Sequence, residues 1–186
     1  MIDPDNVINY NRTQDELEEF WLFCVLVAGK TAKTQAKLLD KLLNGNNKKP
    51  FSKIRRWIRE DKLIDKLASV GTGQYSRLAK CFEESINAKI NWRTVSVKEL
   101  EQIHGVGPKT ARFFVMMTQK NAQYAILDTH MLKYLKSIGY DVPTITPSGK
   151  KYREIEQLFI AEAKKSGKSI AQFDLDLWKK YSKKEV

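Results

Sequence analysis

The sequence has few of the residues that build disulfide scaffolds and metal centres. It holds two cysteines and two histidines among 186 residues. An iron–sulfur cluster held by thiolates alone needs four cysteines, so that cofactor is excluded. His104 and His130 have no matching set of cysteine or acidic ligands nearby in the sequence, so we expect no metal and no cofactor. Cys24 and Cys81 stand in apolar, helix-like contexts and are expected to be small buried hydrophobic residues.

The sequence also lacks long apolar runs. The longest, Phe20–Ala28, is too short to cross a bilayer. No basic segment followed by an apolar stretch and a cleavage site opens the sequence, so we expect a protein that is neither membrane-bound nor secreted. Positive charge, in contrast, is abundant. Thirty-three basic residues against 22 acidic ones give a net charge of +11, which indicates a polyanionic partner or simply a basic soluble protein.

Helical patterns dominate the chain. Thr13 and Glu16 form a capping box ahead of the apolar run, and Ser96 with Glu99 forms a second one. No strand pattern competes and no internal repeat is visible, so the sequence predicts an all-α protein of about nine or ten helices. After the first helix, which ends near residue 28, helices are expected at about 31–43, 54–58, 63–68, 74–87, 96–100, 108–119, 129–138, 151–165 and 170–181.

The segment Leu100–Asp128 is the most informative part of the chain. The Gly105–Gly107 turn allows backbone conformations that are closed to other residues and permits the close approach of another backbone. Pro108 suits the first turn of a helix, whose free N–H groups and dipole make a seat for phosphate. Lys109 lies at the same helix mouth. The positive end of a helix disfavours an ammonium ion, so this position favours a neutral, nucleophilic amine.

Asp128 precedes a periodic apolar run and stands where the N-cap of the next helix belongs. Taken alone, Asp128 is explained by capping, and Lys109 by a plain phosphate contact in a DNA-binding module. The combination is more specific than either residue. It consists of a hairpin, a lysine, one intervening helix and an aspartate at the start of the following helix.

This combination resembles the helix-hairpin-helix (HhH-GPD) superfamily of DNA glycosylases, in which that lysine and that aspartate carry the chemistry. The resemblance implies a base-excision-repair enzyme acting on double-stranded DNA with a damaged, flipped base. It implies that Lys109 attacks C1′ and forms a Schiff base, and that Asp128 stabilises the positive charge on the sugar. The lysine further implies a bifunctional glycosylase/AP lyase, which cleaves the strand by β-elimination.

Within the superfamily, the ending FDLDLWKKYSKK and the missing cluster cysteines are similar to the archaeal-type 8-oxoguanine glycosylases. The implied substrate is therefore 8-oxoguanine. The alternatives are an enzyme for oxidised pyrimidines such as thymine glycol, or a non-catalytic helix-hairpin-helix module. Two segments depart from the family pattern. Residues 28–31 lack the glutamine or asparagine that fills the gap left by the flipped base, and Lys183–Val186 differs from the family's terminal lysine.

The family architecture implies two helical lobes around a cleft. Residues 1–30 and 140–186 are expected to form one lobe, and residues 31–139 the other, with the helix-hairpin-helix at about 96–119. A monomer located with the chromosome, in the cytoplasm or the nucleus, is expected. The implied DNA contacts are Gly105, Val106, Gly107, Thr110, Lys30 and Arg77. The candidates for the base pocket are Phe23, Phe173, Asp174 and Trp178, each of which also fits an ordinary core position.

Overall fold

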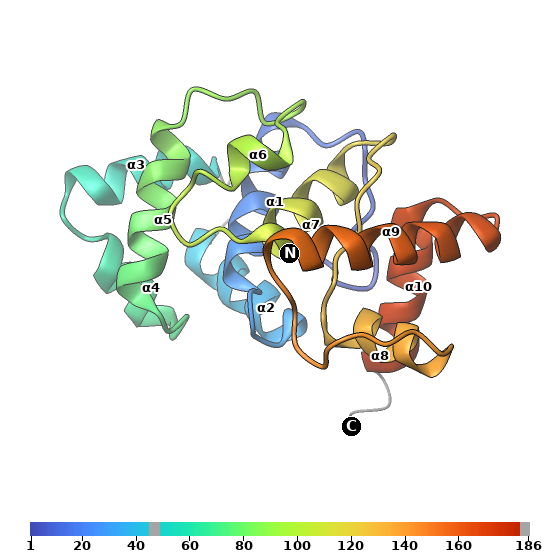
Figure 1. Cartoon of the computed structure of the whole chain (residues 1–186). Helices are drawn as coiled ribbons and strands as arrows, with labels where there is room; N and C mark the ends of the chain where they lie inside the picture. Colours follow the sequence, from blue (N-terminus) through green and yellow to red (C-terminus); the bar gives the residue numbers. More distant parts are fainter. Residues whose placement is uncertain (45–48, 183–186) are drawn as a thin grey trace.

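The computed structural model describes residues 1–44 and 49–182, and in these ranges every regular element is a helix. The all-α prediction is therefore confirmed (Figure 1). No helix in the described ranges has the length and apolar character needed to span a membrane. The ten described helices are α1 (Gln14–Leu26), α2 (Ala32–Leu43), α3 (Pro50–Arg59), α4 (Leu63–Val70), α5 (Tyr75–Asn87), α6 (Val97–Leu100), α7 (Pro108–Thr118), α8 (Thr129–Ser137), α9 (Gly149–Lys165) and α10 (Ile170–Ser182).

Three of the helix starts predicted from the sequence are formed by the predicted caps. The Thr13 and Ser96 side chains each accept a hydrogen bond from the backbone of the glutamate three residues later, and both capping boxes are complete. The Asp128 side chain caps α8 in a similar way, because it accepts hydrogen bonds from the amides of His130 and Met131. Such caps contribute about 1 kcal/mol each to helix stability. The positions at which these helices begin are therefore encoded locally.

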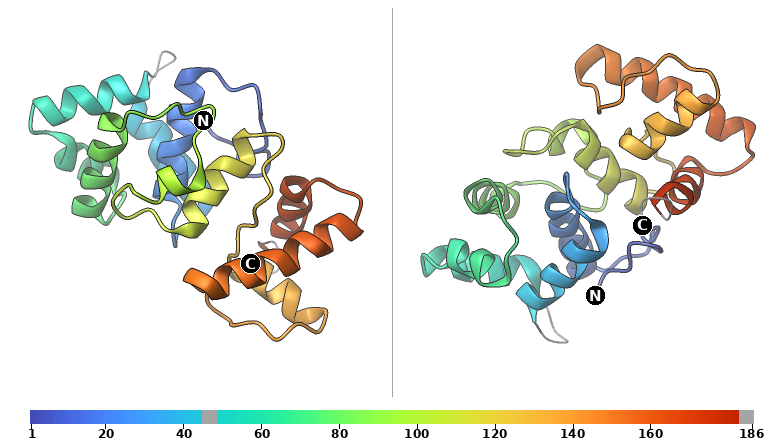
Figure 2. Two further views of the ribbon diagram at one scale, coloured as in Figure 1. Left: turned by 45° about the horizontal axis from the view of Figure 1, so that its top comes forward. Right: turned by 90° about the horizontal axis from the view of Figure 1, so that it is seen from below.

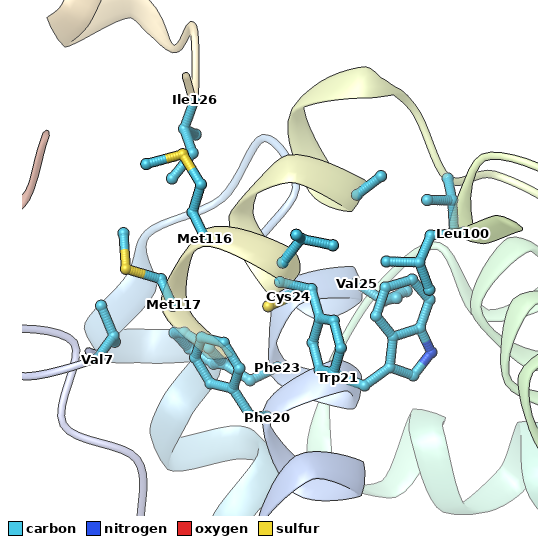
Figure 3. Packing of buried hydrophobic residues seen from close by; sticks show 14 of the residues in the cluster. Val7, Phe20, Trp21, Phe23, Cys24, Val25, Leu100, Met116, Met117 and Ile126 are labelled. Atoms are coloured by element: carbon cyan, nitrogen blue, oxygen red, sulfur yellow. The ribbon is translucent and has the colours of Figure 1, made fainter. Parts of the chain in front are cut away.

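The second half of helix α1 is the centre of the core because Phe20–Leu26 is apolar on all sides, a pattern typical of buried helices. None of the residues in Phe20–Leu26 is more than 1% exposed. The Trp21 ring lies edge-on to Phe114 of α7, with ring centroids 5.3 Å apart, and Trp21 Nε1 donates a hydrogen bond to Ser85 Oγ of α5 at 2.8 Å. Figure 3 shows this layer, in which residues of α1 meet those of α7. The helix that carries Lys109 thus packs against the fully buried half of α1.

Both cysteines are buried and unpaired, as predicted. Burial raises the pKa of the Cys24 thiol well above its usual value. Burial likewise raises the pKa of Cys81 to about 11, although a hydrogen bond with Ser85 acts in the opposite direction. Both side chains are therefore protonated at neutral pH and serve as small core residues.

The helix contacts show which elements pack together. Helix α1 packs on α2, α3, α5 and α7, whereas α8 and α9 pack on α10. Figure 2 shows α8, α9 and α10 together at one side of the molecule, and α10 also contacts α7. The buried half of α1, Phe20–Leu26, requires neighbours on every side and finds them in α2, α3, α5 and α7.

Candidate active site

The turn between α6 and α7 is tight at its first glycine and open at its second. Gly105 has φ +73°, and a Cβ built there would lie 3.2 Å from Arg77 Cγ. Arg77 holds the turn from α5, because its guanidinium donates to the Gly105 carbonyl at 3.3 Å and to Gln74 Oε1 at 2.8 Å. Gly107 caps α7, and a Cβ there would meet no atom within 4 Å. The hairpin thus presents an uncovered backbone at the helix mouth.

Lys109 and Asp128 line one cavity of about 650 Å³, although they come from different helices. Lys109 is in the first turn of α7, after Pro108. Asp128 is the N-cap of α8, and its Oδ1 accepts hydrogen bonds from the amides of His130 at 2.9 Å and Met131 at 3.0 Å. An amine and a carboxylate therefore face a common space that is large enough for a purine base.

The cavity unites most of the residues singled out from the sequence. Its walls come from α1, the α1–α2 loop, α7, the start of α8, and α10. Among the described residues, the predicted site residues that line it are Phe23, Lys30, Lys109, Thr110, Asp128, Asp174 and Trp178. Residues 28–31, the segment that lacks the family's gap-filling residue, also line it, and Gly29 has φ +71°. Lys183–Val186 lies outside the described residues.

Asp174 is the most unusual side chain of the cavity. It is 5% exposed, and its Oδ1 has no hydrogen-bond partner among the described residues. Burial raises the pKa of Asp174 well above its usual value, and the nearby charge of Asp128 acts in the same direction. The pocket therefore contains a carboxyl group whose protonated form is favoured by burial, and that form can donate a hydrogen bond to a ligand.

The structure does not bring Phe173 to the cavity, in contrast to the prediction from the sequence. Its ring packs between Tyr134 and Phe159, with centroid distances of 5.6 and 5.4 Å. Successive residues on a helix point about 100° apart. When Asp174 and Trp178, one turn apart, face the cavity, Phe173 must face α8 and α9.

Like Arg77 and Gly105, two further predicted DNA contacts already have partners within the protein. Lys30 Nζ donates to the Thr72 carbonyl at 2.6 Å, and burial lowers the pKa of Lys30, assisted by the charge of Arg77. Val106 is 8% exposed, and its amide donates to the Ile103 carbonyl at 3.1 Å. The bond of Lys30 ties the α1–α2 loop to the α4–α5 loop, and the bond of Val106 shapes the hairpin.

Sequence reasoning missed several residues of the cavity wall, among them Phe113, Met117 and His130. Phe113 and Met117 line it, and they follow Lys109 at intervals of four along α7, so the helical period carried a usable signal. His130 also lines it, and its Nδ1 is buried with no hydrogen-bond partner in the described chain. The sequence signal for His130 was its position in the first turn of the helix that Asp128 caps.

Comparison with known proteins gives a consistent result. Residues 4–168 match the family described as 8-oxoguanine DNA glycosylase. An 8-oxoguanine DNA glycosylase/AP lyase of Picrophilus torridus is 26% identical over 161 residues, which are 84% of this chain and 74% of that protein. The solved 8-oxoguanine glycosylase/lyase of Methanocaldococcus jannaschii, in complex with DNA containing 8-oxoguanine, has a TM-score of 0.70 at 22% identity and covers 92% of this chain and 83% of its own. The 8-oxoguanine DNA glycosylase of Thermotoga maritima has a TM-score of 0.69 at 23% identity, with 89% and 79% covered.

Fold and site together define a DNA glycosylase of the helix-hairpin-helix class. The match over residues 4–168 goes further, since it includes the hairpin, Lys109 and Asp128. The chain belongs to the 8-oxoguanine DNA glycosylase family. This membership confirms the resemblance inferred from the sequence and, with it, the prediction of a base-excision-repair enzyme that acts on DNA.

Proposed function

We propose that this protein excises 8-oxoguanine from double-stranded DNA and then cleaves the abasic strand, with Lys109 as nucleophile and Asp128 as its electrostatic partner. The single observation that carries the proposal is the meeting of these two side chains in one cavity at the hairpin. The family match supports the choice of lesion, and the Picrophilus relative is named for both activities. We further propose that the enzyme acts as a monomer, located with the chromosome.

The reaction begins when the amine of Lys109 attacks C1′ of the damaged nucleotide. The bond between C1′ and the base breaks, its electron pair leaves with the base, and the base takes up a proton. Positive charge grows on the sugar as the base departs, and the carboxylate of Asp128 stabilises that charge. Asp128 therefore acts mainly in the step that breaks the bond between C1′ and the base.

Strand cleavage follows from the covalent intermediate. The ring oxygen leaves C1′ with a proton, which gives a Schiff base between Lys109 and the opened sugar. Loss of a proton from C2′ then expels the 3′ phosphate by β-elimination, and water hydrolyses the imine to release the lysine. In this scheme the DNA backbone is held by the hairpin and its neighbours Gly105, Val106, Gly107, Thr110, Lys30 and Arg77, and the base by Phe23, Asp174 and Trp178.

Borohydride trapping tests the proposal directly, because it reduces the imine to a stable covalent adduct. The assay uses duplexes that carry 8-oxoguanine, thymine glycol, uracil or an abasic site. We expect the strongest adduct from glycosylase action on 8-oxoguanine, and loss of the adduct in Lys109→Gln with DNA binding retained. Lys136→Gln, at an exposed position in the last turn of α8, is the matched control and should trap normally. An adduct that persists in Lys109→Gln would refute the assignment of the nucleophile.

A further inference from the structure

The segment that delivers Asp128 to the cavity contains no helix, and side chains from outside it hold its backbone. The Tyr152 hydroxyl of α9 donates to the Ala125 carbonyl at 2.8 Å and accepts from the Leu127 amide at 3.1 Å. A further bond reaches this segment from Thr146, whose Oγ1 donates to the Leu127 carbonyl at 2.8 Å. The position of Asp128 is therefore set by α9 and by the loop that precedes it.

The same helix also holds α7, close to Lys109. Arg112, one turn after Lys109, donates from Nε to Glu156 Oε1 at 2.6 Å and from Nη2 to Glu156 Oε2 at 3.2 Å. Its Nη1 donates to Glu101 at 2.9 Å and to the Pro108 carbonyl at 3.3 Å. The first turn of α7 is thus bonded through Arg112 to a carboxylate of α9.

The two sets of bonds meet at one atom. Glu156 Oε1 accepts from Arg112 and also from the Ala125 amide, at 3.0 Å. Glu156 is 4% exposed, Arg112 is 7% exposed, and the Arg112 guanidinium lies over the Tyr152 ring at 4.6 Å from its centroid. Hydrogen bonds to charged groups strengthen in such a dry environment, and the paired charges neutralise each other.

We propose that Glu156 and Tyr152 are positioning residues for base excision, because together they fix the carrier of Lys109 relative to the carrier of Asp128. The proposal rests on the proposed function and assigns these side chains no contact with DNA. Displacements of about 1 Å at reacting groups can change rates by about 100-fold. Loosening the bonds of α9 to the two segments therefore slows the step that needs both groups at C1′ at the same time.

The two reactions of the enzyme place different demands on this geometry. Excision needs the amine and the carboxylate together, because charge develops on the sugar as the base leaves. Cleavage at a preformed abasic site begins from an aldehyde, which Lys109 attacks without breaking a glycosidic bond. Loss of the positioning contacts should therefore slow excision much more than cleavage at a preformed abasic site. A partly unfolded enzyme would lose both activities in equal proportion.

Tyr152→Phe is the variant of choice, since it removes only the hydroxyl and keeps the buried ring. Tyr140→Phe is the matched control, because the Tyr140 hydroxyl also bonds to α9, donating to Glu162 Oε1 at 2.8 Å, and it touches neither catalytic segment. Single-turnover rates are measured on 8-oxoguanine duplex and on preformed abasic duplex. Both are divided by the fraction of enzyme that borohydride traps on abasic DNA, so loss of folded protein does not affect the result.

We expect Tyr152→Phe to slow excision by about 10-fold to 100-fold, with abasic cleavage slowed less than about 3-fold and Tyr140→Phe unchanged in both. Equal rates for Tyr152→Phe and the wild-type enzyme, or equal losses in the two reactions, would overturn the positioning role. Failure of the proposed function is a separate result, in which the wild-type enzyme itself neither excises nor traps.

Discussion

The turn at Gly105 offers a test of how the hairpin is held. Gly105→Ala places a methyl group 3.2 Å from Arg77 Cγ, in a backbone conformation of φ +73°. The left-handed conformation costs a residue with a Cβ about 1–2 kcal/mol, and the stiffer unfolded chain returns about 0.4–1 kcal/mol. Displacing Arg77 adds about 1 kcal/mol for a weakened hydrogen bond. We therefore expect a loss of about 2 kcal/mol in the free energy of unfolding, or about 4–8 °C in Tm.

Gly167→Ala separates the free-energy cost of the left-handed backbone conformation from the cost of the contact with Arg77. Gly167 has nearly the same φ, +71°, but a Cβ there would meet no atom within 4 Å. Its expected loss is about 1 kcal/mol or less. Denaturant unfolding measures both variants, and fluorescence anisotropy measures their binding to a duplex with an abasic analogue. We expect about 10-fold weaker DNA binding for Gly105→Ala only. Equal unfolding free energies and equal affinities for the two variants would refute the role given to Arg77.

Two further substitutions separate chemistry from stability. Asparagine caps helices as well as aspartate does, so Asp128→Asn should change the free energy of unfolding by less than about 0.5 kcal/mol. Single-turnover excision by the same variant should fall by about 100-fold or more. Parallel losses of stability and of excision would contradict a catalytic role. Burial raises the pKa of Asp174 in the folded protein, whereas the unfolded chain has a pKa of about 3.9. Between these two pKa values the folded protein binds a proton that the unfolded chain has released. Stability contributed by that proton is lost as the pH rises from about 4 through the folded pKa. Asp174→Asn should therefore be more stable than the wild type at pH 8, by about 1 kcal/mol or more, with a smaller decrease in unfolding free energy between pH 5 and 8. A decrease equal to that of the wild type would contradict the assignment.

Local signals in the sequence were sufficient for the helices and for the centre of the site. The capping boxes at Thr13 and Ser96 and the cap at Asp128 were predicted because each depends on residues within one helical turn. The convergence of Lys109 and Asp128 was predicted from the family pattern, and the cavity contains both residues.

Contacts between distant parts of the chain were not predictable in this way. The pair of Arg112 and Glu156 joins residues 44 positions apart, and no periodic pattern marks either of them as a partner. Phe173 and Asp174 illustrate the same limit on one helix. Periodicity shows which residues share a face, but the neighbouring helices decide which face meets the cavity. The partners of Phe20–Leu26 in α1 could not be predicted for the same reason, since a segment that is apolar on every face gives no indication of its neighbours.

The burial of Cys24 and Cys81 has a consequence for the conditions under which a repair enzyme of this family works. Oxidised bases form where peroxides and radicals are present, and the same oxidants attack exposed thiolates. Only the thiolate reacts readily, and burial keeps both side chains protonated and out of contact with solvent. The protein therefore resists, through its own core packing, the kind of chemical damage whose products it removes from DNA.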